Sequence, residues 1–339
     1  MSNKKSFLLL IPAIIFMFVI SSCTKKDEPG SQSGNDTTSV MVGDKVMLKY
    51  NPKKDDVLKY KITNSTNVKE NSPNTGGKDL TNDQNITIFY SEQVNEVNES
   101  GVITYKVTFD SILVSAKISS GDTSVSQNYS SNIKDSVYSK PDFVEFNALI
   151  NNPFKMRVSS RGEILEAYEL ENVHDAIYKA YGDTLTDKEK EVVKQTLNTT
   201  YFKDLLQNSF QKFPENAIAK DSSWMITDSD QLLIFPVKKI LNYKLSDVKT
   251  ENGKTLVTID ATLDNEFIEK QVKEKDLTAT VEDSKTTGTG KVVLNLTRGC
   301  IVNKETNLAI DISIKMAAGG QSAKSVQTIK TGFKVELLN

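Results

Sequence analysis

The sequence predicts an α+β protein that is mainly β, built from curved antiparallel sheet with a helical insertion packed against it. Beyond about residue 42, most of the chain alternates apolar and polar residues with period two, which is typical of strands that bury one face. Turn signals separate consecutive runs, so strands that are neighbours in sequence are expected to pair. Between about residues 169 and 213 the apolar period becomes helical. We therefore expect one β-rich globular region over residues 42–339.

The first 22 residues have the order of a secretory signal peptide. Lys4 and Lys5 form a positive start, and residues 7–20 form an unbroken apolar core. This core is too short for a stable transmembrane helix, which needs about 20 apolar residues. Small residues and a cysteine follow at once, so we expect residues 1–22 to be cleaved.

Residues 20–23, with the sequence Ile-Ser-Ser-Cys, resemble a lipobox. In a lipobox, the thiol of the cysteine carries diacylglycerol and the cysteine becomes the first residue of the mature protein. Cys23 is therefore the predicted lipidation site, and the membrane is an expected partner through this anchor. The alternative is a free cysteine just past an ordinary signal peptide.

Residues 23–41 are predicted to be a flexible tether, because this stretch of Gly, Ser, Asn and Thr has almost nothing to bury. Residues 25–28, Lys-Lys-Asp-Glu, resemble the surface export signal of Bacteroidetes lipoproteins. The expected location is the outer membrane, lipid-anchored on the cell surface, with a periplasm-facing anchor as the alternative. Thr37 lies in a short motif that resembles an O-glycosylation signal, which makes it a candidate glycosylation site.

Strands and hairpins fill most of the remaining chain. Hairpin turns are predicted at residues 98–101, 161–162 and 252–253, which have the sequences Asn-Glu-Ser-Gly, Arg-Gly and Asn-Gly. The cleanest alternation puts five apolar residues on one face of a strand: Leu308, Ile310, Ile312, Ile314 and Met316.

A shift of the apolar phase near Asp110 and Ser111 predicts a β-bulge within the long strand that begins near residue 102. Long twisted strands with bulges curve, so the expected shape resembles the open half-barrels of lipoprotein carriers and lipocalin-like binders. Such a shape favours an apolar cleft, and a hydrophobic ligand or an envelope partner is the expected binding partner.

The helical insertion is expected to begin near residue 169 and to end at Phe213, which precedes a proline. Residues 186–189, Thr-Asp-Lys-Glu, fit a capping box. Apolar residues from Val192 to Phe210 recur at helical spacing, so this stripe is expected to pack against the sheet.

Composition excludes several function classes. The formal charge is −2, or −4 without Lys4 and Lys5, and no basic run interleaved with aromatics occurs, so nucleic acid is not an expected partner. Two cysteines and one histidine are too few for a His/Cys metal site, and no metal ion, cofactor or catalytic residue is predicted. Cys300 is expected to be a buried thiol, and His174 a surface residue of a helix.

Three further motifs have structural interpretations. The stretch Gly288-Thr289-Gly290-Lys291 lacks the spacing of a phosphate-binding loop, and its glycines are expected to begin a strand. Residues 228–230, Asp-Ser-Asp, lack the glycine and glutamate of a calcium-binding EF-hand loop and are expected to form a solvated turn. Trp224 is expected to pack in the core, with a sugar-stacking platform as the alternative.

Three stretches in this order resemble an uncharacterised family of Bacteroidetes lipoproteins: residues 48–61, residues 213–224 and residues 288–299. The resemblance covers most of the chain after the tether and implies no activity and no catalytic residue. We therefore expect a membrane-anchored envelope lipoprotein that is a non-catalytic binding or structural module. The alternative is a carboxylate-dependent hydrolase acting on envelope or extracellular polymers.

Overall fold

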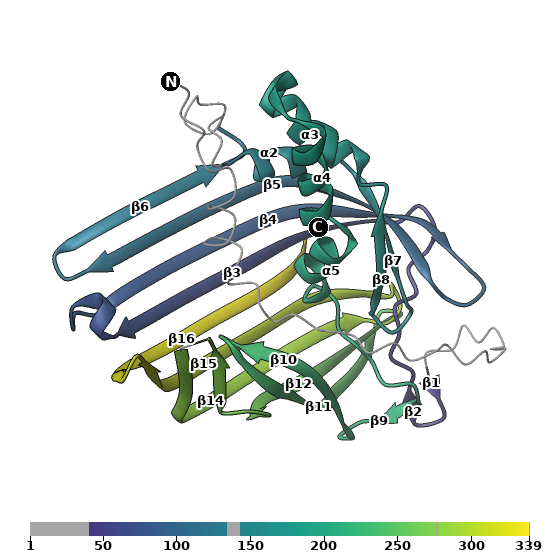
Figure 1. Ribbon diagram of the computed structural model, residues 1–339. Helices are drawn as coiled ribbons and strands as arrows, with labels where there is room; N and C mark the ends of the chain where they lie inside the picture. Colours follow the sequence, from purple (N-terminus) through teal and green to yellow (C-terminus); the bar gives the residue numbers. More distant parts are fainter. Residues whose placement is uncertain (1–40, 134–142, 276, 339) are drawn as a thin grey trace.

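A computed structural model describes residues 41–133, 143–275 and 277–338 and shows the predicted α+β, mainly β fold (Figure 1). The signal peptide, Cys23, Thr37 and the rest of the predicted tether before residue 41 lie outside the described residues. Within the described chain, one antiparallel 13-stranded sheet dominates, in the order β10-β11-β12-β14-β15-β16-β3-β4-β5-β7-β8, with β13 beside β14 and β6 beside β5. This sheet is curved and does not close on itself.

The long strands of the sheet are β3 (Val57–Asn71), β4 (Leu80–Val97), β5 (Ile103–Ser120), β11 (Phe235–Glu251), β12 (Lys254–Phe267), β14 (Leu277–Asn295), β15 (Cys300–Ala318) and β16 (Gln321–Leu338). The shorter ones are β6 (Thr123–Ser130), β7 (Phe154–Val158), β8 (Ile164–Tyr168), β10 (Ser223–Leu232) and β13 (Gln271–Glu274). A separate three-stranded sheet contains β1 (Met41–Val42), β2 (Lys45–Val46) and β9 (Ile218–Ala219).

Most neighbours in the main sheet are joined by hairpins, as predicted. The turn at Asn252 and Gly253 joins β11 to β12 with φ values of 51° and 73°, the left-handed conformation that a type I′ turn requires. The central pair is different, because no hairpin joins its strands. The last strand, β16, lies antiparallel beside β3, with Val326 opposite Asn71 and Leu338 opposite Lys59. The C-terminal strand of the described chain is therefore placed in the middle of the sheet.

The predicted bulge is present in β5. Phe89 of β4 lies opposite Ser111, and the next residue, Tyr90, lies opposite Phe109, so Asp110 is the additional residue. Such an insertion increases the local twist and bends the strand. Phe109, the residue before this insertion, is buried in the main core.

The main core lies between the concave face of the sheet and four helices, α2 (Val144–Leu149), α3 (Glu171–Tyr181), α4 (Asp187–Thr196) and α5 (Thr199–Gln207). Figure 1 shows α3, α4 and α5 in front of this face. The helical insertion is confirmed, but it consists of three helices with a 3-10 turn (Gly182–Thr184) after α3, and α2 is an additional short helix. No helix in the described part of the chain has the length and apolar character to cross a membrane.

Local sequence explains how the helical segment begins and where it packs. The capping box is confirmed: the backbone N–H of Thr186 donates to Glu189 Oε2 at 2.8 Å, and that of Glu189 donates to Thr186 Oγ1 at 3.3 Å. Phe202 of α5 is fully buried, and its ring lies 4.5 Å from that of Phe154 on β7. The helices thus cover β7 and β8 as well as the centre of the concave face.

The strands β10, β11 and β12 form a ribbon that separates from the rest of the sheet. Strand β12 pairs with β14 only from Leu256 to Leu263, and β13 takes its place beside the first residues of β14. The free end of the β10–β11 hairpin packs over the concave face and forms a second core, which contains Leu232, Phe235 and Val237 together with Ile310, Ile312 and Ile314. The ribbon and the sheet therefore face each other across a space.

Candidate functional site

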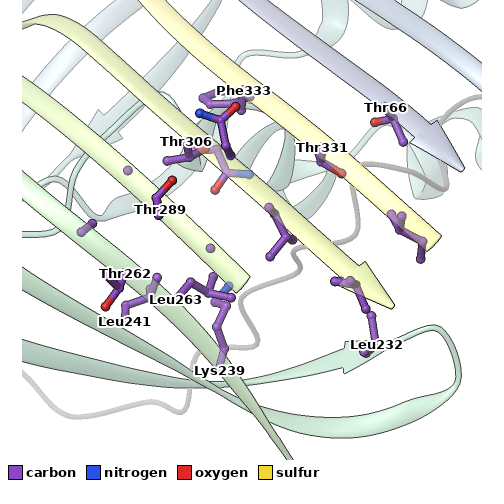
Figure 2. A pocket seen from close by; sticks show the side chains of 18 of the residues that line it. Thr66, Leu232, Lys239, Leu241, Thr262, Leu263, Thr289, Thr306, Thr331 and Phe333 are labelled. Carbon is purple, nitrogen blue, oxygen red and sulfur yellow. The ribbon is translucent and has the colours of Figure 1, made fainter. Parts of the chain in front are cut away.

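A cavity of about 560 Å³ lies between the β10–β12 ribbon and strands β14, β15, β16 and β3. Figure 2 shows Thr306 and Thr331 on neighbouring strands of the sheet, with Leu232 and Lys239 on the hairpin that crosses them. The volume of the cavity lies within the range of ~300–1,000 Å³ that is typical of small-molecule sites. Apolar side chains line much of it: Val68, Leu241, Leu263, Leu308, Ile329 and Phe333.

Three neighbouring positions in the floor of the cavity carry little or no side chain: Ala261 on β12 and Gly288 and Gly290 on β14. The two glycines were expected to begin a strand, but they lie inside β14. A Cβ at Gly288 would lie 2.7 Å from the Cβ of Leu263, and one at Gly290 would lie 3.1 Å from Cγ2 of Thr306. Leu263 therefore leaves no room for a side chain at Gly288, whereas Thr306 would have to shift slightly to admit one at Gly290.

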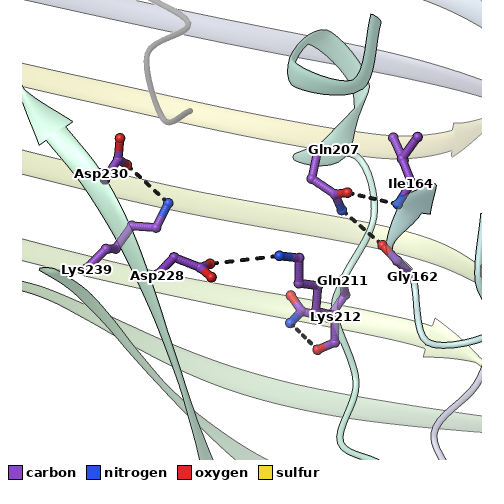
Figure 3. A network of polar contacts seen from close by, with 8 residues as sticks. All are labelled: Gly162, Ile164, Gln207, Gln211, Lys212, Asp228, Asp230 and Lys239. Atoms are coloured by element: carbon purple, nitrogen blue, oxygen red, sulfur yellow. Dashed lines mark hydrogen bonds and ion pairs between the residues drawn. The ribbon is translucent and has the colours of Figure 1, made fainter. Parts of the chain in front are cut away.

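Two aspartates of β10 in the ribbon pair with lysines, and one of these pairs is buried (Figure 3). Lys239 Nζ lies 3.3 Å from Asp230 Oδ2, and both side chains are less than a tenth exposed. Lys212 Nζ lies 3.9 Å from Asp228 Oδ2. The prediction of a solvated turn at residues 228–230 is wrong, because lysines neutralise both aspartates on the inward face of β10.

Lys304 of β15 is a second buried lysine that lines the cavity. Unlike Lys239, it does not form an ion pair with a described carboxylate. Its Nζ donates a hydrogen bond to the backbone oxygen of Phe210 at 2.7 Å. No described carboxylate lies within ion-pair distance of it. Burial, together with the neighbouring charge of Lys239, lowers the pKa of Lys304 to about 7.

Other polar side chains lie at the same end of the cavity. Asn64 of β3 is 7% exposed, and its Oδ1 has no hydrogen-bond partner among the described residues. Asn64 lies opposite Phe333, which lies opposite Thr306, two residues along β15 from Lys304. A buried amide without a partner is costly, so this end of the cavity favours a polar group of a ligand.

A second buried ionisable group, Glu92 of β4, lies on the same face of the sheet within the main core. Its side chain is 2% exposed, and burial raises its pKa to about 8. Tyr60, Tyr90, Tyr105 and Cys300 surround it. Burial also raises the pKa of Cys300 to about 11, so this cysteine is a protonated, buried thiol, as predicted.

Lys304 and Glu92 were not predicted as site residues, although the sequence contains a signal for both. Each is a charged residue in the apolar phase of an alternating strand. Glu92 shares its phase with Ile88, Tyr90 and Val94, and Lys304 shares its phase with Ile310 and Ile312. A charge in that position predicts a buried polar group.

The remaining predicted residues have structural surroundings. His174 lies on α3, where its Nε2 is 2.8 Å from the backbone oxygen of Leu197. Trp224 packs against the core, and its ring stacks on Tyr243 with the centroids 5.2 Å apart, which supports the core-packing interpretation. The described residues include no group of three or more side chains that could hold a metal ion. The two carboxylates of β10, Asp228 and Asp230, are each paired with a lysine and give no support to the hydrolase alternative.

The solved structures that match this chain have low identity and low TM-scores. A lipovitellin structure concerned with lipid–protein interactions is 11% identical, with a TM-score of 0.45, covering 85% of this chain and 26% of that chain. The present chain thus spans about a quarter of the length of that lipovitellin chain. OccK7 (OpdD) of Pseudomonas aeruginosa is 7% identical, with a TM-score of 0.23 and coverage of 84% and 100%. At these TM-scores the likenesses carry no argument about function.

A family model identifies the chain. No functionally curated protein matches it. The model for a family of unknown function matches residues 100–301, which include the helical segment, the β10–β12 ribbon and β14. This agrees with the predicted resemblance to an uncharacterised family, and the chain belongs to the family of unknown function DUF6263.

Proposed function

We propose that this protein is a non-catalytic, lipid-anchored envelope protein that binds a hydrophobic ligand between its β10–β12 ribbon and its sheet. The observation that carries the proposal is the cavity of about 560 Å³ with largely apolar walls and small residues in its floor. A fully packed core would have no such space, because protein interiors leave few voids larger than a water molecule. Ala261, Gly288 and Gly290 line this space without a side chain larger than a methyl group.

The anchoring part of the proposal rests on the sequence before the described residues. The lipobox-like residues 20–23 and the tether over residues 23–41 support attachment through Cys23 to the outer membrane. The charged residues 25–28 support exposure on the cell surface, in keeping with the resemblance to Bacteroidetes lipoproteins.

Cys23→Ala is expected to release the protein from membranes, because this change removes the atom that carries the lipid. Fractionation of cells expressing each form, with a high-salt wash, measures the release, and mass spectrometry detects the lipid. Cys300→Ala is the matched control, because Cys300 is buried in the core and should not affect anchoring. A Cys23→Ala protein that stays with the washed membrane contradicts the lipobox interpretation.

Proteinase added to intact cells tests whether the protein lies on the cell surface or faces the periplasm, since cleavage before lysis requires surface exposure.

Filling the cavity is expected to weaken ligand binding. Ala261→Leu adds three carbons to the floor, and a fluorescent fatty acid should bind it at least about tenfold more weakly than the parent, which corresponds to about 1.4 kcal/mol. The Cys23→Ala form serves as the parent protein, so that lipid on the anchor cannot compete. Thr258→Leu, on the opposite face of β12, is the control. If the parent does not bind the probe at all, the ligand proposal is wrong and a scaffold or partner-binding role remains.

A further inference from the structure

The two ends of the cavity differ in chemistry. At one end lie the Lys304 ammonium and the Asn64 amide, both on inward-facing positions of the sheet. At the other end lie Leu232 of the ribbon and the apolar pair Ile310 and Ile329, which are opposite each other on β15 and β16. A ligand that fits both ends has a polar head and an apolar tail.

The charge at the polar end indicates the sign of the head. Lys239 has Asp230 as a counter-ion, whereas Lys304 has only a neutral backbone carbonyl among the described residues. A buried charge without a counter-ion is destabilising, and an anion placed beside it would supply the missing charge. Lys239 increases the positive potential there, as its lowering effect on the Lys304 pKa indicates.

The distance between the ends indicates the length of the tail. Lys304 and Ile310 are six positions apart on one strand, which corresponds to about 20 Å at the rise of ~3.3 Å per residue. A carbon chain of about 16 atoms has a similar extended length, since each bond of ~1.5 Å advances the zigzag by somewhat less than its length. The cavity therefore suits one acyl chain along β15 and β16.

We propose that the ligand is a single-chain amphiphile with an anionic head group, carboxylate or phosphate, which binds beside Lys304 and Asn64 while its tail extends toward Leu232 and Ile310. This inference rests on the proposed function and adds the chemical class of the ligand. Asn64 can present either its oxygen or its NH₂ group to the head, because rotation of the terminal amide exchanges the two.

Three twelve-carbon ligands with different head groups test the proposal. Dodecanoic acid, dodecan-1-ol and dodecyl phosphate are each titrated against Nile red bound to the full chain carrying Cys23→Ala, and the displacement of the dye measures each affinity. The acid is expected to bind about tenfold more tightly than the alcohol, because a hydrogen bond to a charged group contributes at least that factor. Comparison of the acid with the phosphate shows which anionic head is preferred.

Lys304→Met keeps the length and apolar stem of the side chain and removes its charge. This variant should bind the acid about tenfold more weakly and the alcohol within about twofold of the parent. Lys291→Met is the control, because Lys291 lies on β14 with its side chain 64% exposed. Equal affinity of the parent for acid and alcohol, or an unchanged preference in Lys304→Met, overturns the anionic-head proposal while leaving a hydrophobic site. Failure of all three ligands to displace the dye, or of Nile red to bind, instead overturns the proposed function.

Discussion

Replacing Glu92 with glutamine is expected to stabilise the protein at pH 7 by about 3 kcal/mol. The folded protein keeps this carboxyl buried, with Oε1 lacking a hydrogen-bond partner among the described residues, and its pKa is raised from 4.5 to about 8. At pH 7 the unfolded chain gains an ionised, hydrated carboxylate, whereas the folded state must hold the neutral acid. Glutamine is neutral in both states and has nearly the same shape, so this penalty disappears.

The sign of the pH dependence follows from proton binding. Below pH 4.5 both states hold the Glu92 proton, and between 4.5 and about 8 the folded state holds more of it than the unfolded state. The free energy of unfolding therefore falls as pH rises through this window, by up to about 1.4 kcal/mol per unit, and the loss is complete above pH 8.

Urea denaturation of the Cys23→Ala protein with and without Glu92→Gln, at pH 5 and at pH 8, measures this effect. The difference between the two proteins should be small at pH 5 and several kcal/mol at pH 8. Glu99→Gln, an exposed change in the turn between β4 and β5, is the control and should leave the pH dependence unchanged. A Glu92→Gln effect of the same size at both pH values contradicts the assignment of a neutral, buried acid.

Gly299→Ala is expected to destabilise the protein by about 3 kcal/mol or more, because strain and overlap add at this position. Gly299 precedes β15 with φ at 65°, a conformation that L side chains rarely adopt. A Cβ there would overlap the backbone N and C atoms of Asn51, which belongs to a different segment of the chain. Neither backbone can move without disturbing the start of β15 or the residues before β3.

Gly253→Ala is the matched control, because Gly253 has a similar φ of 73° and nothing within 4 Å of its would-be Cβ. It should cost only the backbone strain, about 1 kcal/mol. The difference in free energy of unfolding between the two variants, measured by urea denaturation, isolates the contact with Asn51. Equal losses would mean that this contact does not constrain the fold.

The three stretches that suggested a family resemblance converge at this contact. The Tyr50 ring lies 5.2 Å from that of Phe213, and its hydroxyl accepts a hydrogen bond from the backbone N–H of Gln211 at 2.7 Å. Asn51, the next residue, lies against Gly299. Residues from all three stretches therefore meet at one packing site in this chain.

Local signals predicted the elements of the fold but not its global arrangement. Alternation and turn residues such as Asn252 and Gly253 act between neighbours in sequence, so the strands, hairpins, bulge and capping box were predicted correctly. The separation of the β10–β12 ribbon has no such local signal. It depends on where β12 stops pairing with β14, after Leu263, and the cavity depends on that separation. The place of Gly288 and Gly290 inside β14 likewise depends on their neighbours across the sheet, which local sequence does not specify.

The pairing of β3 with β16 determines when the sheet can be completed. Ser65 and Gly332 face each other across this pair, although 267 residues separate them along the chain. Contacts of such long range form slowly, because the entropy of closing the loop is lost before the contact can stabilise the fold. As the chain emerges N-terminus first, β3 has an unpaired edge until β16 has followed, and later β15 has one too. Unpaired edges invite pairing with other chains, so the interval between emergence of β3 and arrival of β16 is the period in which a nascent chain of this protein is most prone to aggregate.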